Sequence, residues 1–244
     1  MSRSQPTDLA VNPATRWFEW NGEHGGVRYY DRDLKKNVEV PTPFTFVLLD
    51  ELGSVRGWHD ASQSGIYSNE VRDTRQDVLV VKAFKGGTLA EGLYQAIKDR
   101  VNVMGGRFTA NCYIGYKSDR GLALGSIKFK GGTLGAWMEF RKAHRADLYS
   151  QAVEITGYTE GKKGRVVFRV PTFRLKALSP DSNTQAIDLD KELQAYLDVY
   201  LAKTKREQVE TVGTLADNDR DVVPTDEDND YRTPSDIDDI DVPF

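Results

Sequence analysis

Between residues 17 and 178 the chain alternates short apolar runs with clusters of Gly, Asn and Asp. The runs are rich in β-branched and aromatic residues, and this composition predicts β-strands. The clearest strands are predicted at 44–50, 77–84, 108–116 and 122–129. Two further pairs of runs flank short polar loops and predict β-hairpins, namely 27–31 with 37–41 and 152–158 with 165–173.

Three stretches have helical spacing instead. After Thr88 the apolar residues Leu89, Leu93, Ala96, Ile97 and Val101 follow one stripe, and Thr88 with Glu91 predicts a capping box, so we expect a helix over 88–101. A less regular helix is predicted over 133–148. A third begins near Asp188, where six apolar residues share one face: Leu189, Leu193, Tyr196, Leu197, Tyr200 and Leu201.

The hexapeptide FKGGTL occurs at 84–89 and again at 129–134. Each copy is predicted to form a tight turn between a strand and a helix, with Gly allowing the turn and Thr capping the helix. The alternative is a phosphate contact through the glycine N–H groups beside Lys85 and Lys130. Neither copy is a P-loop, because no GK[ST] follows the glycines. The structural turn is the preferred interpretation.

Composition divides the chain into three parts. We predict a flexible arm over 1–14, one domain over 15–212, and a disordered acidic tail over 213–244, because apolar periodicity stops there. The whole chain has 33 Lys or Arg against 37 Asp or Glu. The tail holds eleven acidic residues and two Arg, so its net charge is −9, which leaves 31 Lys or Arg and 26 Asp or Glu, net +5, in residues 1–212.

Several classes of protein are disfavoured. The single Cys112 cannot form an intramolecular disulfide, no run of about 18 apolar residues is present, and the start of the chain is polar. These features predict a cytoplasmic protein that does not enter a membrane. The three histidines lack metal-ligand spacing, no G-x-S-x-G nucleophile motif occurs, and the acidic run at 226–230 is not an EF-hand loop. We therefore expect no enzyme, no metal and no cofactor.

The body does contain aromatic residues interleaved with cations. Stacking rings and phosphate-binding cations are what a protein needs to bind single-stranded nucleic acid without reading its sequence. In the run 27–31, Tyr29 shares a face with Val27, and Tyr30 shares the other with Arg28 and Arg32, so Tyr30 is predicted to be exposed. Core packing is the alternative for each ring. The candidate binding residues are Arg28, Tyr30, Arg32, Lys35, Trp58, Tyr67, Arg107, Tyr113, Lys117, Lys162 and Lys163.

The chain ends in DIDDIDVPF. An acidic segment tethered to a basic groove competes with nucleic acid at an effective concentration of about millimolar. Charge alone does not require a terminal Phe, whereas a partner pocket that captures a ring and a free carboxylate does. The candidate partner-binding residues are Asp238, Asp239, Asp241, Val242, Pro243 and Phe244.

This tip resembles the acidic tip of bacterial single-stranded DNA-binding proteins, with Val242 in place of their Ile. The body, through WNGEHGGVRYYD, PFTFVLLDELGSVRGWHD, SNEVRD and GSIKFKGGTL, resembles the single-stranded DNA-binding proteins of tailed phages of the Enc34 type. The resemblance implies a mainly β protein, an OB-type β-barrel with inserted helices and a disordered acidic C-terminus. It also implies a role in phage DNA replication, recombination or repair, protecting single strands and recruiting partner proteins through the tail. The helices at 88–101 and 133–148 are large for a minimal OB barrel.

Other readings of the sequence stay open. The body could be a protein-interaction or recombination-mediator module whose tail mimics DNA and which has no affinity of its own for single strands. RNA is an alternative ligand, because stacking and phosphate contacts scarcely distinguish it from DNA. The helix predicted at 188–201 could pair with a second copy, although packing on its own body is favoured. A nuclease is the weakest reading, because no carboxylate cluster in the body suits a metal.

Overall fold

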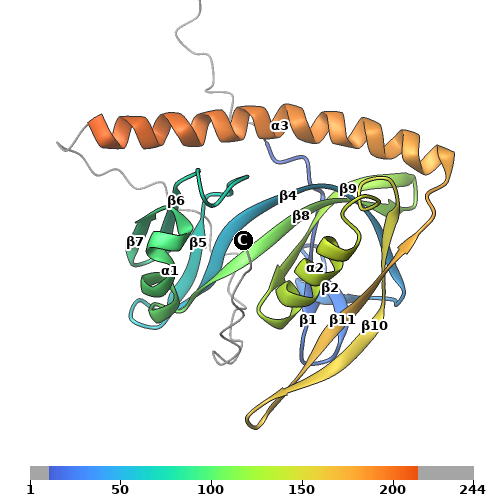
Figure 1. Ribbon diagram of the computed structural model, residues 1–244, viewed down its shortest axis with the longest axis horizontal. Coiled ribbons are helices and arrows are strands. Elements are labelled where there is room, and N and C mark those ends of the chain that lie inside the picture. Colours follow the sequence, from blue (N-terminus) through green and yellow to red (C-terminus); the bar gives the residue numbers. More distant parts are fainter. Residues whose placement is uncertain (1–10, 214–244) are drawn as a thin grey trace, which may run out of the picture.

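The computed structural model describes residues 11–213, which form a mainly β architecture with three helices (Figure 1). One sheet runs in the order β3-β2-β1-β9-β8-β4-β5-β6-β7, and β10 pairs with β4 and β11. The β1–β9 pair is parallel and the others are antiparallel.

The strands are β1 (Arg16–Asn21), β2 (Gly26–Asp31), β3 (Lys36–Val40), β4 (Phe44–His59), β5 (Ser64–Ser68), β6 (Leu79–Ala83), β7 (Gly87–Gly92), β8 (Gly106–Ser118), β9 (Gly121–Lys130), β10 (Ala152–Lys163) and β11 (Val166–Lys176). The helices are α1 (Tyr94–Val103), α2 (Gly132–Ala143) and α3 (Pro180–Gly213).

The long strand β4 branches the sheet. Its first four residues pair with β10, its last four with β5, and most of its length with β8. The β10–β11 hairpin then returns toward the turn after β1, where the Arg169 main-chain N donates to the Gly22 carbonyl at 2.8 Å. The Trp20 indole Nε1 donates to the Arg169 carbonyl at 2.7 Å. The sheet therefore curls round its core, although no ladder joins its edge strands within residues 11–213.

The main core lies between the curled sheet and α2. Alternation along β8 sends Cys112 and Ile114 into this core, where both have no exposed surface. Trp137 of α2 is also fully buried and stacks on Phe129 with ring centroids 5.0 Å apart. A second core lies under α1 and takes its residues mainly from β5, β6 and β7.

The third helix covers part of the opposite side of the sheet (Figure 1). Leu193 and Leu197 are fully buried there against Leu52, Tyr113 and Leu124. The amphipathic helix predicted from the apolar spacing is confirmed, and its packing on its own body is observed. It begins earlier than predicted, at Pro180, which suits the first helical position because that N–H has no partner inside the helix. Ser179 precedes it, and its Oγ accepts the Ser182 main-chain N–H at 3.1 Å.

The predicted strands and both hairpins are confirmed, and so is α2, although it ends at Ala143 and not at 148. Strands β1 and β5 were not predicted, and the helix predicted over 88–101 is wrong in its first half. Residues 87–92 form β7, which buries Leu89 and Ala90. Gly92, with φ +148°, breaks the pattern, and α1 starts only at Tyr94, after Leu93, which makes no side-chain cap. The predicted Thr88–Glu91 capping box is thus absent at this helix start. Tertiary pairing makes a strand here in spite of the helical spacing of the apolar side chains.

The two FKGGTL copies differ accordingly. The first is the turn between β6 and β7, so the strand-to-helix turn predicted there is wrong. The second does join β9 to α2, as expected. There the Thr133 hydroxyl donates to the Lys130 carbonyl at 2.6 Å, closing the turn, while the cap position is Gly131 with φ +54°. Identical hexapeptides therefore take different structures because their downstream partners differ.

Candidate nucleic-acid interface

The strand register places cations from distant parts of the chain on one outward side of the sheet. Because Cys112 and Ile114 face the core, Thr109 and Asn111 face outward. Across β9, Lys130 lies opposite Thr109 and Lys128 opposite Asn111. Following the ladders through the sheet adds four more cations to this side. We call the resulting set the basic face, and its residues are Arg28, Arg56, Lys82, Arg107, Lys128 and Lys130.

One aromatic cluster lies at the β1–β2 end of the basic face. Trp17 is 41% exposed and Tyr30 is 51% exposed, and the register that pairs Phe18 with Tyr29 brings them side by side. The Arg32 guanidinium lies 5.7 Å from the centroid of the Trp17 ring. Val27 is buried and Tyr29 packs against the core, so the exposure predicted for Tyr30 is confirmed.

A second aromatic cluster lies at the β5–β6 end. Tyr67 pairs with Arg56 on one side and Lys82 on the other, and its ring centroid is 4.6 Å from that of Phe84, which is 41% exposed. Trp58 is half-buried and lies two residues beyond Arg56 on β4, so both point to the same side. Cations thus lie between two groups of rings, an arrangement that can hold phosphates and stack bases.

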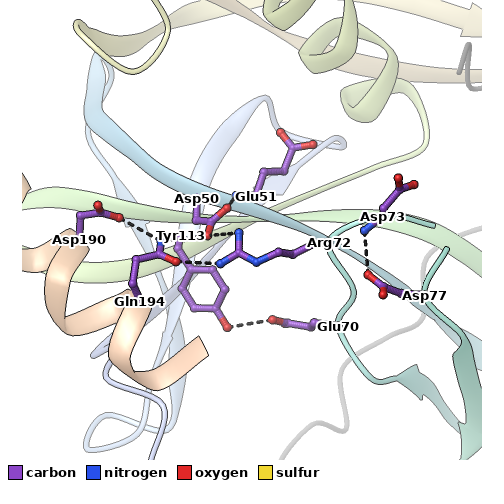
Figure 2. Close-up of polar contacts among 9 residues, drawn as sticks. All are labelled: Asp50, Glu51, Glu70, Arg72, Asp73, Asp77, Tyr113, Asp190 and Gln194. Atoms are coloured by element: carbon purple, nitrogen blue, oxygen red, sulfur yellow. Dashed lines mark hydrogen bonds and ion pairs between the residues drawn. The ribbon is translucent and has the colours of Figure 1, made fainter. Parts of the chain in front are cut away.

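A half-buried carboxylate, Glu70, lies among these cations. Glu70 accepts a hydrogen bond from the Tyr113 hydroxyl at 2.8 Å (Figure 2). It also accepts one from Asn111 Nδ2 at 2.9 Å. Asn111 Nδ2 also donates to Ser54 Oγ at 2.8 Å. Burial raises the pKa of Glu70, while the hydrogen bond from Tyr113 and the charges of Arg56 and Lys128 oppose that rise.

The charges at the β1–β9 junction are partly balanced. The Arg28 guanidinium contacts Glu19 at 2.6 Å, and Glu19 also lies opposite Lys128 in the ladder. Burial lowers the pKa of Lys130, whereas the nearby charge of Glu19 opposes that lowering. The negative charge of Glu19 therefore helps to keep Arg28, Lys128 and Lys130 close together on the same surface.

A polar network fixes α3 beside the basic face (Figure 2). The Arg72 guanidinium donates to Asp50 Oδ2 at 2.8 Å and to Gln194 Oε1 at 2.7 Å. Gln194 Nε2 completes the network by donating to Asp50 at 3.0 Å and to Asp190 at 3.1 Å. Close by, the Asp73 main-chain N donates to Asp77 at 3.0 Å, which closes the loop that carries Arg72. The helix is thereby set in position as one border of the face.

The structure contradicts one predicted binding residue. Tyr113 does point to the outward side, as alternation required, but it is only 1% exposed because α3 and the segment before β1 cover it. Its hydroxyl donates to Glu70 and accepts from Asn12 Nδ2 at 3.3 Å. Tyr113 is therefore a packing residue and not a stacking platform.

The other predicted residues fall into four places. Arg28, Tyr30, Arg32 and Lys35 lie at the β1–β2–β3 end, and Lys35 occupies the exposed β2–β3 turn. Trp58, Tyr67 and Arg107 lie at the other end, with Arg107 Nη1 bound to the carbonyls of Asn102 and Gly106 at 2.7 Å. Lys117 is exposed near the end of β8, opposite Leu122, away from both clusters. Lys162 and Lys163 belong to the β10–β11 hairpin, where Lys163 pairs with Val166.

The candidate binding residues predicted from the sequence leave out four cations of the basic face and two rings of the aromatic clusters, namely Arg56, Lys82, Lys128 and Lys130, with Trp17 and Phe84. The sequence could have predicted the outward position of Lys128 and Lys130, because in GSIKFK they alternate with the apolar Ile127 and Phe129. The sequence suggested a phosphate role for Lys130 only through the glycine turn. The tail residues Asp238, Asp239, Asp241, Val242, Pro243 and Phe244 lie outside the described residues, as do residues 1–10 of the predicted arm. Asn12 and Ala14 contact the sheet.

Within residues 11–213, no group of three His, Cys, Asp or Glu side chains is arranged to hold a metal ion. No helix of this part is both long enough and apolar enough to cross a membrane. Comparison of the chain with profiles of known protein families, with curated proteins and with solved structures finds no match.

Proposed function

We propose that this protein binds single-stranded DNA largely without sequence preference, and that the basic face is the binding surface. The observation that carries the proposal is the row of cations between two aromatic clusters, one exposed and one partly exposed, on one side of a single sheet. Stacking is worth about 1–3 kcal/mol per base, and cations supply a sequence-independent attraction for phosphates. Base stacking requires unpaired bases, so rings on an open surface favour a single strand over a duplex.

The proposal extends to the fold. An OB-type barrel is supported by the curl of the sheet, by the return of β11 to the turn after β1, and by the parallel β1–β9 pair. In barrels of that type the outer surface of the strands binds nucleic acid. The β5–β6–β7 extension with α1 and the crossing helix α3 elaborate it.

The acidic tail completes the proposed mechanism. Its charge of −9 opposes the +5 of residues 1–212, so the tethered tail competes with DNA phosphates for the basic face. When DNA displaces it, the tip ending in Phe244 is available to replication or recombination proteins. The protein acts as a non-enzymatic coat for single strands in this scheme, protecting them and recruiting partners.

The test is a titration of fluorescein-labelled oligo-dT with the full chain and with a 1–212 truncation, at two salt concentrations. A duplex of equal length is the competitor. We expect salt-sensitive binding to the single strand, stronger for the truncation at low salt. Equal affinity of the two proteins would remove the competing role of the tail. If neither protein binds, the protein-interaction reading replaces this proposal, and the tail peptide becomes the bait for a partner.

A further inference from the structure

Glu70 lies where α3 meets the basic face. Besides its bonds to Asn111 and Tyr113, its main-chain N donates to the Tyr200 hydroxyl of α3 at 2.9 Å. The residue is therefore fixed from the sheet and from the helix at once. It is the acidic group at the centre of a surface that is otherwise proposed to attract phosphates.

Charged and titratable groups face Glu70 from every element around it. Arg56 of β4 and Lys128 of β9 are the cations, and Tyr113 of β8 with Tyr196 and Tyr200 of α3 are the phenols. Burial raises the pKa of Tyr196 to about 12 and raises those of Tyr113 and Tyr200 as well, so the phenols are uncharged near neutral pH. Arg72, two residues along, is already held by Asp50 and Gln194.

Arg56 lies two residues along β4 from Ser54, which shares the Asn111 amide with Glu70. The Arg56 Nε is buried and has no hydrogen-bond partner among the residues that the structure describes. A buried N–H donor without a hydrogen-bond partner lowers the stability of the fold, and a phosphate oxygen is an acceptor with a charge opposite to that of the guanidinium. While Glu70 is ionised, its negative charge lies close to the path of any phosphate that reaches Arg56.

We propose that Glu70 is a proton-linked brake on nucleic-acid binding, whose negative charge repels phosphates from Arg56 and Lys128 while it is ionised and is removed when it is protonated. This inference rests on the proposed function. DNA phosphates add negative charge beside the carboxyl and draw the cations away, so the bound state favours its protonated form. Binding then takes up a proton, and affinity rises as pH falls through the range in which Glu70 gains that proton.

The test measures the dissociation constant for labelled oligo-dT from pH 5.5 to pH 8 at constant ionic strength, with wild type, E70Q and the control E139Q. Gln keeps the size and one acceptor of Glu70, and Glu139 is an exposed carboxylate on α2, which packs on the other side of the sheet. We expect E70Q to bind about five- to tenfold more tightly than wild type at pH 8, with the gap closing as pH falls. E139Q should keep both the affinity and the pH profile of wild type. The histidines are unchanged in all three proteins, so the ratio of wild type to E70Q isolates Glu70.

Other results would overturn the brake alone, or the brake together with the proposed function. If E70Q binds no more tightly than wild type, or if the ratio stays constant across pH, the brake is overturned while the proposed function stands. If wild type binds no single strand at any pH, both are overturned. A second experiment needs no variant: calorimetric titrations of wild type with oligo-dT, in two buffers of different ionisation enthalpy, measure the protons taken up on binding. Absence of proton uptake near the pH at which affinity changes would also overturn the inference.

Discussion

Asp50 and Glu51 are neighbours on β4 whose carboxylates hold different helices on opposite sides of the sheet (Figure 2). Asp50 binds Arg72 and Gln194 beside α3, whereas Glu51 accepts the Trp137 indole N–H of α2 at 2.8 Å and pairs with Arg141. A register shift between Leu48 and Asp50 precedes the pair. Burial raises the pKa of Glu51, and Arg141 opposes this. One dipeptide therefore sets both the core helix and the border of the basic face.

The exposed rings should contribute to binding and not to folding. Tyr30→Ala and Trp17→Ala are each expected to weaken oligo-dT binding by about 1–3 kcal/mol through the loss of stacking. Their melting temperatures should stay close to that of wild type, because both side chains are exposed. Tyr149→Ala is the matched control, since Tyr149 is 59% exposed and lies after α2. Unchanged affinity in Tyr30→Ala would exclude that ring from the site.

Lys128 and Lys130 of β9 should contribute to the binding of single-stranded DNA by contacting its phosphates. Replacing Lys128 and Lys130 together with Ala is expected to reduce the slope of log affinity against log salt by about 1.4, because each cation that neutralises a phosphate of a single strand adds about 0.7 to that slope. Fluorescence titrations at four or more salt concentrations give the slope. Lys142→Ala, at an exposed position of α2, should leave it unchanged. A slope equal to that of wild type in the double variant would place the phosphate path elsewhere.

The apolar buried face of α3 should contribute to its docking far more than its exposed positions do. Leu197→Ala is expected to lower the free energy of unfolding by about 2–5 kcal/mol, because Leu197 is fully buried against the sheet and Ala leaves a cavity. Val199→Ala, two residues away at a position that is 47% exposed, should cost far less. Urea denaturation followed by circular dichroism measures both. Equal effects would mean that the helix is not held by this packing.

Glu154 should make the free energy of unfolding depend on pH in the acidic range. Its carboxylate binds Lys176 at 2.7 Å, Thr45 at 2.9 Å and Arg174, and these partners lower its pKa to about 2, with Lys176 the largest cause. Since the folded-state pKa lies below the unfolded value, this stabilisation is present above about pH 4.5 and is lost as pH falls toward 2.

Glu154→Gln tests this. The variant should be less stable than wild type at pH 7, and the difference should shrink between pH 4.5 and pH 2.5, as measured by urea denaturation at each pH. Glu160→Gln is the control on the same hairpin, since Glu160 is exposed and pairs with Arg169 at 3.2 Å. A difference that is independent of pH would mean that the ionised form of Glu154 is not what stabilises the fold.

The sequence by itself determined most of the strands, both hairpins and the amphipathic α3, because each depends on a local period of apolar side chains, whereas β1, β5 and β7 were not predicted. The same alternation correctly placed Tyr30 outside and Tyr29 against the core. The opposite charges of body and tail also follow from composition alone. These features need no knowledge of which elements meet in space.

Only the tertiary structure decided which outward positions stay open and which are covered. Tyr113 and Tyr30 are both on outward faces, yet α3 packs on the first and leaves the second exposed. Residues 87–92 became a strand because β6 offered a partner, despite a helical spacing. The basic face joins Arg56 to Lys128 through the pairing of β4 with β8 and of β8 with β9, at a separation of 72 residues. Long-range pairing and coverage depend on the whole chain, so no local pattern could have specified them.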